Sequence, residues 1–276
     1  LERLKYDKYN TGTIQPKLNS EVVKKIKISI PTNKEQEKIA EFLTAVDEKI
    51  GTLEQKVENI ETYKRGMMQK IFSQKIRFTH SDGSQYPQWQ TKKLGELGSF
   101  YRGLTYDKSN VKEKGNLVLR SGNIQEGKLV LNRDLQFVNE PVYFMQVLQE
   151  GDIAICMANG SRNLVGKSGV YDGSYDGTIT VGAFCSVYRS KNILTIYLLQ
   201  SWQYLKYLDM LLAGTNINNL KNSDLGELKF EIPVDREEQK KVADFLSGLD
   251  SKIIITREKL EKTKEFKKGI LQRMFV

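Results

Sequence analysis

Residues 36–72 read QEKIAEFLTAVDEKIGTLEQKVENIETYKRGMMQKIF, and residues 239–275 read QKKVADFLSGLDSKIIITREKLEKTKEFKKGILQRMF. The second stretch repeats the first without a gap, 203 positions later (36 to 239). Upstream, the similarity continues with a shift of one residue through Ile30-Pro31 and Ile232-Pro233. A repeat of this length is not a chance match. It indicates that the chain contains one copy, and part of a second copy, of a larger unit.

Both copies carry apolar residues at alternating spacings of three and four, which predicts coiled-coil helices over residues 34–76 and 236–275. Each predicted helix follows a proline and contains none, as expected of a helix that begins after the proline. A single helix of about 40 residues, roughly 60 Å long, would leave its apolar seam in water. We therefore expect the two helices to pack on each other, in antiparallel orientation. The polar seam residues are expected to lower stability and fix the register; they are Lys64, Thr256, Thr263 and Lys267.

The segment between the two helices has a different character. Residues 77–92 are polar and rich in turn-forming residues, which predicts a linker. Residues 93–233 contain short apolar runs separated by glycine turns, which predicts an α+β domain on a mainly β scaffold. Residues 1–31 resemble the end of this domain and are predicted to be the C-terminal part of a first one. The predicted strands are Leu117–Arg120, Lys128–Leu131, Asp152–Ala158, Val165–Tyr171, Thr178–Arg189 and Lys229–Ile232, with a helix over Leu194–Leu212.

Composition narrows the possible functions of the 276-residue chain. Lys and Arg total 43 against 34 Asp and Glu, a net charge of +9, which favours a polyanionic partner. The single histidine, His80, argues against histidine-based metal sites and Ser-His-Asp triads. The two cysteines, Cys156 and Cys185, cannot form a disulfide framework and are expected in the core. No apolar run approaches the roughly 18–20 residues of a membrane span. We expect a non-catalytic cytoplasmic protein.

Three polar loops offer the side chains that contact phosphates and base edges in DNA complexes. Arg162 suits guanine O6 and N7, and Asn163 suits adenine N6 and N7. A solvated protein surface would have a similar composition, and Asn159-Gly160 could simply form a hairpin turn. The candidate DNA-binding residues are Arg102, Tyr106, Lys108, Lys112, Arg120, Ser121 and Asn123 in the first loop region, Ser161, Arg162, Asn163 and Lys167 in the second, and Asn216, Asn218 and Lys221 in the third.

Two other functions are open at this point. Residues 159–169, NGSRNLVGKSG, are similar to a phosphate-binding P-loop, but five residues instead of four separate Gly160 from Gly166. No helix is predicted after this segment, so an anion site here would lack a helix N-terminus. The other alternative is a coiled-coil scaffold whose inserted domain binds protein. A nucleotide-binding enzyme ranks below this scaffold.

The repeated stretches IPTNKEQEKIAEFL…YKRGMMQKIF and IPVDREEQKKVADFL…FKKGILQRMF resemble the conserved regions of type I restriction-modification specificity (S) subunits. The segments NGSRNLVGK and SGNIQEGKL also resemble target recognition domain sequence. The resemblance covers nearly the whole chain. It implies a DNA-recognition subunit that reads one half of a bipartite site and docks methylation (M) subunits through its long helices. Restriction (R) subunits would then join through the complex.

The resemblance also implies that the chain itself catalyses nothing and holds no cofactor. S-adenosylmethionine, ATP and Mg²⁺ are expected on the partner subunits. One departure from the family pattern is that the first target recognition domain is represented only by residues 1–31. We therefore expect a chain truncated within that domain, which reads one half-site of double-stranded DNA unless it pairs with a second copy as a homodimer.

Overall fold

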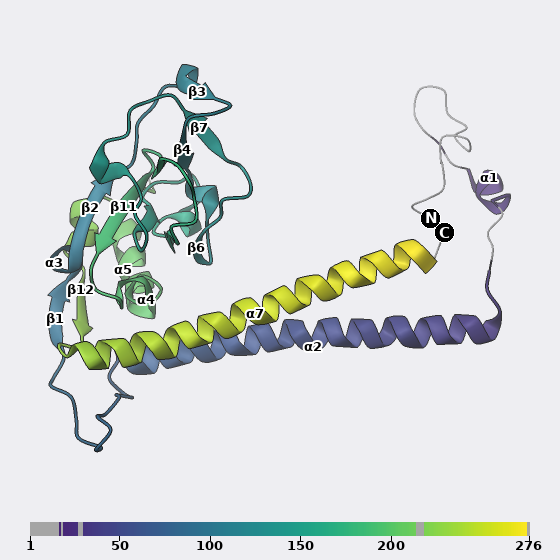
Figure 1. Ribbon diagram of the computed structural model, residues 1–276, viewed down its shortest axis with the longest axis horizontal. Helices are drawn as coiled ribbons and strands as arrows, with labels where there is room; N and C mark the ends of the chain where they lie inside the picture. Colours follow the sequence, from purple (N-terminus) through teal and green to yellow (C-terminus); the bar gives the residue numbers. More distant parts are fainter. Residues whose placement is uncertain (1–16, 18, 27–29, 214–217, 275–276) are drawn as a thin grey trace. The chain divides into compact units, whose positions relative to one another are not determined.

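The computed structural model describes Lys17 and residues 19–26, 30–213 and 218–274 (Figure 1). The fold is of the predicted α+β class, with two long helices, α2 (Asn33–Phe72) and α7 (Arg236–Met274). The chain divides into two compact units, Leu1–Glu61 with Ser251–Val276, and Thr62–Asp250. Both long helices contribute residues to both units. None of the helices in the described residues is both long and apolar enough to cross a membrane.

The two long helices begin with the same repeated contact. The Gln36 side-chain amide donates to the Pro31 carbonyl at 2.8 Å, and the Gln239 amide donates to the Pro233 carbonyl, also at 2.8 Å. At the start of α2, the Thr32 N–H and hydroxyl donate to the Glu35 carboxylate, and these bonds lower the pKa of that carboxyl. The repeated sequence therefore builds the same helix start twice, from local contacts.

The first unit contains the antiparallel part of the two helices (Figure 1). Ion pairs join Asp47 to Lys267, Glu54 to Lys264 and Glu61 to Arg257. The residue numbers of the partners rise along α2 and fall along α7, as expected of antiparallel helices. The side chains of Leu53, Ile253, Thr256 and Leu260 are buried along the seam. The Thr256 hydroxyl donates to the Lys252 carbonyl of its own helix, which satisfies this buried polar seam residue.

The second unit is built on three sheets. A six-stranded sheet has the order β2-β11-β8-β9-β6-β5, a four-stranded sheet has the order β10-β4-β7-β3, and β1 pairs with β12. The strands are β1 (Gln90–Lys93), β2 (Gly98–Arg102), β3 (Val111–Lys112), β4 (Asn116–Leu119), β5 (Ile124–Gln125), β6 (Gly127–Leu129), β7 (Gln136–Val138), β8 (Ile153–Cys156), β9 (Ser168–Val170), β10 (Ile179–Val181), β11 (Cys185–Ser190) and β12 (Lys229–Ile232). The short helices are α1 (Ser20–Lys24) in the first unit, and α3 (Leu94–Leu97), α4 (Thr195–Leu198), α5 (Trp202–Ala213) and α6 (Asn222–Gly226) in the second.

The end of α2 and the start of α7 belong to the core of the second unit. Ile71 and Leu246 are fully buried in one cluster with Leu94, Tyr188 and Phe230 of the mainly β domain. Two polar contacts support this core. Lys64 pairs with Asp250 at 2.6 Å and donates to Gln200 at 3.1 Å, and Arg77 pairs with the fully buried Glu238 at 2.9 Å. The domain between the helices is therefore fixed to both of them by apolar packing and by paired charges.

The predicted helices and linker differ from the structure in three places, each for a local reason. Helix α2 ends at Phe72, before the predicted residue 76, because Gln74 adopts a left-handed backbone with φ 56°. The predicted helix 194–212 is broken at Ser201, whose hydroxyl bonds to both the Leu198 carbonyl and the Tyr204 N–H. Residues 77–92, predicted as a linker, are packed, since Tyr86 and Trp89 are buried.

Candidate nucleic-acid interface

The turn Gly182–Cys185 is the point where several strands of the second unit end. The Cys185 N–H donates to the Gly182 carbonyl at 2.8 Å and closes the turn. The Gly103 N–H, directly after β2, donates to the Cys185 carbonyl, and the Gly182 N–H donates to Leu119 at the end of β4. A side chain at Gly103 would place its Cβ 2.2 Å from the Gly182 oxygen, so only glycine fits there. The ends of β2, β4 and β10 are thus held at one place.

The loop after β8 is fixed to the same turn. The N–H groups of Met157 and Ala158 both donate to the Phe184 carbonyl, at 2.8 and 3.1 Å. At the base of the loop, the Gly166 N–H donates to the Cys156 carbonyl at 2.7 Å. The Gly166 carbonyl in turn accepts from the buried Tyr204 hydroxyl at 2.9 Å. The loop from 157 to 167 is therefore anchored to the turn and to α5, and it contains no helix of the kind a P-loop requires.

Side-chain amides connect this loop to two other predicted regions. The Asn159 amide donates to the Ser121 hydroxyl at 3.0 Å, and the Asn218 amide donates to the Gly160 carbonyl at 3.2 Å. Residues far apart in the sequence are brought together in this way. We call the resulting area the strand-end surface, and it comprises Arg102, Arg120, Ser121, Asn159, Gly160, Ser161, Arg162, Asn163, Phe184, Asn218 and Lys221.

The cations of the strand-end surface are exposed, and two are held in place by carbonyl groups. The Arg162 guanidinium donates to the Asp209 carbonyl at 3.2 Å and lies 4.0 Å from the Asp209 carboxylate. The Arg120 guanidinium donates to the Asp134 carbonyl at 3.2 Å. The carbonyl partner of Arg120 orients the guanidinium without neutralising it, whereas the charge of Arg162 is partly offset by the Asp209 carboxylate. The surface therefore presents positive charge beside hydrogen-bonding amides, the combination that phosphates and base edges require.

Several predicted site residues have other positions. Asn123 is 1% exposed, and its amide donates to the carbonyls of Val130 and Arg133 and accepts from the Arg120 N–H. This side chain stabilises a turn, and the structure does not bring it to the surface. Tyr106 is half-buried against the cluster of Leu104, Val118 and Val138.

The lysines of the first predicted region lie outside the strand-end surface. Lys108 is in the short helix η2 (Lys108–Asn110) and Lys112 in β3, which pairs with β7. Both are exposed, and no hydrogen bond found in the described residues links either of them to the strand-end surface. Lys167 is half-buried at the base of the loop 157–167. Asn216 falls outside the described residues.

Phe184 is a surface residue that sequence reasoning missed. Its side chain is 71% exposed, although its backbone is fixed by two hydrogen bonds. The mostly apolar character of segment 178–189 predicts one continuous strand, and the structure divides it at this turn. Gly182 within that run is the signal that could have revealed the turn, since an isolated glycine in a strand pattern often marks a bulge or bend.

The two cysteines lie in the core, as predicted. Cys156 and Cys185 are directly opposite each other in β8 and β11, and both are buried. The neighbouring thiol and burial raise the pKa of Cys185, which favours the unreactive thiol form. Within the described ranges, no group of three His, Cys, Asp or Glu residues could hold a metal ion. These thiols therefore contribute packing to the domain that carries the strand-end surface.

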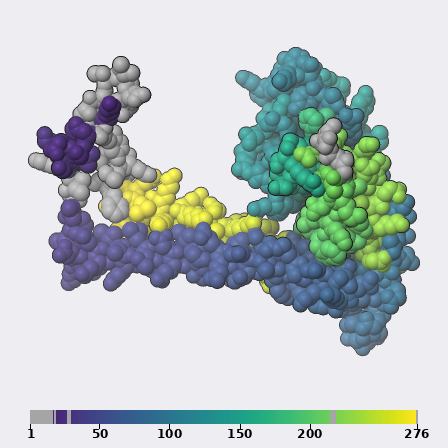
Figure 2. All heavy atoms as spheres, turned by 180° about the vertical axis from the view of Figure 1, so that it is seen from behind, coloured from purple at the N-terminus to yellow at the C-terminus, as the bar shows by residue number. Residues whose placement is uncertain are grey.

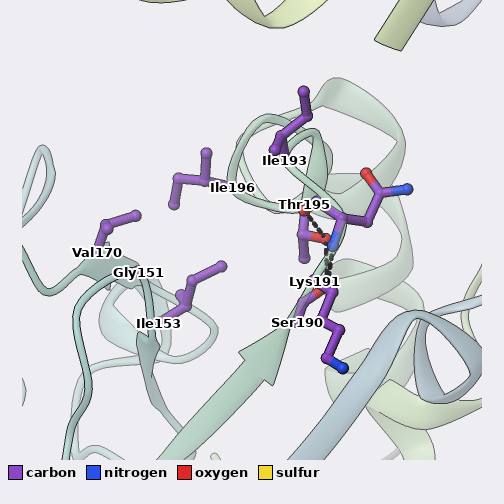
Figure 3. A pocket seen from close by; sticks show the side chains of 9 residues that line it. Gly151, Ile153, Val170, Ser190, Lys191, Ile193, Thr195 and Ile196 are labelled. Carbon is purple, nitrogen blue, oxygen red and sulfur yellow. Dashed lines mark hydrogen bonds between the residues drawn. The ribbon is translucent and has the colours of Figure 1, made fainter. Parts of the chain in front are cut away.

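A hollow of about 270 Å³ lies beside the start of α4 (Figure 3). Its apolar side chains are Ile153, Val170, Ile193 and Ile196. Three residues at its edge are engaged in the chain's own turn, because the Ser190 hydroxyl accepts from the Asn192 N–H and bonds to the Thr195 hydroxyl at 2.9 Å. A ligand site would present free polar groups that converge on the hollow. This hollow is a packing feature.

Comparison with known proteins gives a consistent result. The family described as "Type I restriction modification DNA specificity domain" matches residues 1–62 and 87–265. The MjaVIII specificity subunit of Methanocaldococcus jannaschii is 30% identical over 94% of this chain and 64% of its own length. The EcoKI specificity subunit of Escherichia coli is 30% identical over 66% of this chain and 41% of its own. The chain thus spans less than two thirds of these relatives.

A solved structure supports the fold. The S subunit of a type I restriction-modification system from M. genitalium matches with a TM-score of 0.60 at 19% identity, over 98% of this chain and 68% of that one. The repeated helix motif and the α+β domain between the helices agree with the family match over most of the sequence. The chain belongs to the family of type I restriction-modification DNA specificity subunits.

Proposed function

We propose that this chain is a sequence-recognition subunit of a type I restriction-modification complex and that its strand-end surface contacts double-stranded DNA. The observation that carries this proposal is the convergence of separate chain segments on one rigid area, held by the bonds of Asn159 and Asn218. Exposed cations from four segments lie on that area, and they are Arg102, Arg120, Arg162 and Lys221. Specific DNA binding requires both phosphate contacts and fixed base-edge donors.

The residues of this surface have different proposed roles. Arg162 and Asn163 are exposed near the tip of the loop 157–167, where their side chains can reach base edges. The Asn159 amide is already bonded to Ser121, so we assign it to loop positioning. Because the described residues contain a single domain of this kind, we propose that one copy of the chain reads one half of a bipartite site.

The long helices are proposed to dock the methylation subunits. Ile255 and Phe266 of α7 are 52% and 55% exposed, although they are large and apolar. Apolar side chains on a helix surface suit contact with another protein. Co-purification of tagged methylation subunits with the wild-type chain and with Ile255→Ser/Phe266→Ser tests this role. A complex that forms equally well with both chains would remove these residues from the proposed docking site.

The DNA proposal is tested by selecting sites from a random duplex library with the assembled complex and then comparing variants on the selected site. Arg162→Ala should cost about 1–3 kcal/mol and relax the preference at one base pair. Lys112→Ala is the matched control, because it removes the same charge outside the strand-end surface. An equal loss of DNA affinity in the two variants would count against base reading by Arg162. A DNA affinity independent of salt concentration would count against phosphate contacts.

One observation favours protein binding as a second function of the domain. Tyr143 and Phe144 are 73% and 76% exposed, side by side at the start of the short helix η4 (Phe144–Gln146). Such a pair suits a protein interface. Tyr143→Ser/Phe144→Ser should leave affinity for duplex DNA unchanged if the pair contacts only protein. A loss of DNA affinity would instead extend the DNA surface to η4.

A further inference from the structure

The ion pairs between α2 and α7 follow the internal repeat. Asp47 pairs with Lys267 at 2.5 Å in the first unit, and Lys64 pairs with Asp250 at 2.6 Å in the second. In the repeat, Asp250 is the equivalent of Asp47, and Lys267 is the equivalent of Lys64. The two bridges are thus the same pair of repeat positions, used in both directions. Each helix carries both members of this pair, so this pair cannot distinguish one helix from the other.

The other two ion pairs do distinguish the helices. Glu54 pairs with Lys264 at 2.8 Å, and Glu61 pairs with Arg257 at 2.5 Å. The repeat equivalents of Glu54 and Glu61 are Arg257 and Lys264, so the charge is reversed between the two copies. Helix α2 is acidic at both positions and α7 is basic at both. At these two positions the helices are complementary to each other, and neither is complementary to itself.

Two α2 helices paired in the same antiparallel register would meet like charges. Glu54 of one copy would face Glu61 of the other, and the reverse contact would repeat the repulsion. Two α7 helices would place Arg257 against Lys264 in the same way. The four side chains involved are 29–51% exposed. Exposed charges of this kind add little to stability, but they discriminate between partners in coiled coils.

We propose that Glu54, Glu61, Arg257 and Lys264 favour an α7 helix as the partner of α2 and disfavour pairing between two α2 helices. A second copy of the chain would then associate through these helices only by exchange, with the α2 of each copy on the α7 of the other. All four ion pairs are kept in such an exchange. This selection does not depend on DNA binding.

The test uses a disulfide trap in the full chain. Val57 lies on the seam midway between Glu54 and Glu61, so a thiol introduced by Val57→Cys would meet its own copy if two α2 helices paired in this register. Adding Glu61→Lys would place a lysine opposite Glu54 in both contacts between two α2 helices, which makes these contacts attractive. The same change makes the contact of position 61 with Arg257 repulsive. We expect the yield of disulfide-linked dimer of the Val57→Cys chain to rise about fivefold or more in low salt. The increase should shrink in 1 M NaCl, where exposed charges are screened.

Two further variants keep the test decisive. Glu58→Lys makes the same change of charge at an exposed α2 position outside the four ion pairs, and it should leave the yield unchanged. Glu61→Gln removes the repulsion without creating a new one, so it should give an intermediate yield even if Glu61→Lys unfolds. The proposal is wrong if Val57→Cys alone is trapped as readily as its Glu61→Lys derivative, or if Glu58→Lys raises the yield equally.

Discussion

The two copies of the repeat form the same local structure but differ in burial. In the first copy, apolar side chains are exposed in α1 and just before α2, with Val23 50% and Ile30 68% exposed. In the second copy, the equivalent residues Leu225 and Ile232 are 0% and 5% exposed in the core of the domain. Figure 2 shows one face of α2 open along its first part. In the described residues, α1 and the start of α2 therefore form with their apolar side chains largely exposed, whereas residues 93–213 bury the equivalent positions of the second copy.

This difference separates two contributions to stability. Caps and helix spacing depend on residues within one turn, so both copies have them. Burial depends on a partner surface, so among the described residues it differs between equivalent positions: Leu246 is buried where Leu43 is half-buried, and Ile71 is buried where Met274 is 37% exposed. Matched substitutions at equivalent positions therefore measure how much packing against the domain adds to each residue's contribution to the free energy of unfolding.

The largest difference is expected between Glu238→Ala and Glu35→Ala. Glu238 is fully buried and accepts from two nitrogens of Arg77, at 3.1 and 2.9 Å. Its removal leaves a largely buried guanidinium without its counter-charge and should cost about 3–5 kcal/mol. The equivalent Glu35 is exposed and only caps α2 through Thr32, so its loss should be small. Urea unfolding followed by circular dichroism measures both, and similar losses would contradict the comparison.

Leu246→Ala and Leu43→Ala test the apolar contribution. Leu246 is 0% exposed in the main core cluster, and its truncation should cost about 2–5 kcal/mol through lost transfer energy and a cavity. Leu43 is only half-buried, so its truncation should cost about 1 kcal/mol. The same unfolding measurement applies. If Leu43→Ala cost as much as Leu246→Ala, the first copy would be covered by a partner that the burial values do not show.

A smaller difference is expected between Lys64→Met and Lys267→Met. The Lys64 side chain is largely buried and has two partners, Asp250 and Gln200. Its loss should cost about 1.5–3 kcal/mol, the range for hydrogen bonds to charged groups. Lys267 pairs with the more exposed Asp47, and its loss should cost about 0–1 kcal/mol. Thermal melts at low and high salt check this, because only the Lys267 contribution should be sensitive to salt.

The smallest difference is expected between Gln36→Ala and Gln239→Ala. Each variant loses one bond of 2.8 Å to a proline carbonyl. The two losses should therefore be similar, about 0.5–1.5 kcal/mol each. Hydrogen exchange at the first amides of α2 and α7 reports the effect directly. A much larger effect at Gln239 would show that the start of α7 depends on its domain more than on its own cap.

The features that sequence reasoning predicted depend on short-range patterns. The seam of Leu53 and Leu260 follows from spacing, and the strand β12 follows from alternating polar and apolar residues before a proline. Strands β2 and β7 were not predicted, because their partners, β11 and β4, lie far away in the sequence and supply the pairing. The break at Ser201 was also missed, since a serine inside an apolar run gives no clear signal before its hydroxyl bonds are known.

The site shows the same limit. Exposed, positively charged loops could be located from composition, which is how Arg102 and Arg162 were identified. The role of Asn123 could not be predicted from composition. Its amide donates to the carbonyls of Val130 and Arg133, which lie on a loop whose path depends on the sheet. Phe184 was missed for the opposite reason, since an apolar residue was assumed to be inside.

The closed base of the loop after β8 has a consequence for how the sequence of such a protein can evolve. The Cys156 N–H and carbonyl bond to Lys167 and Gly166, so the two ends of the loop are tied together below its tip. Residues 161–163 can then be replaced as a cassette while the sheet beneath them and the positioning bond of Asn159 stay intact. A lineage could acquire a new preference by exchanging a few codons, and grafting such cassettes between relatives is a direct route to engineered variants.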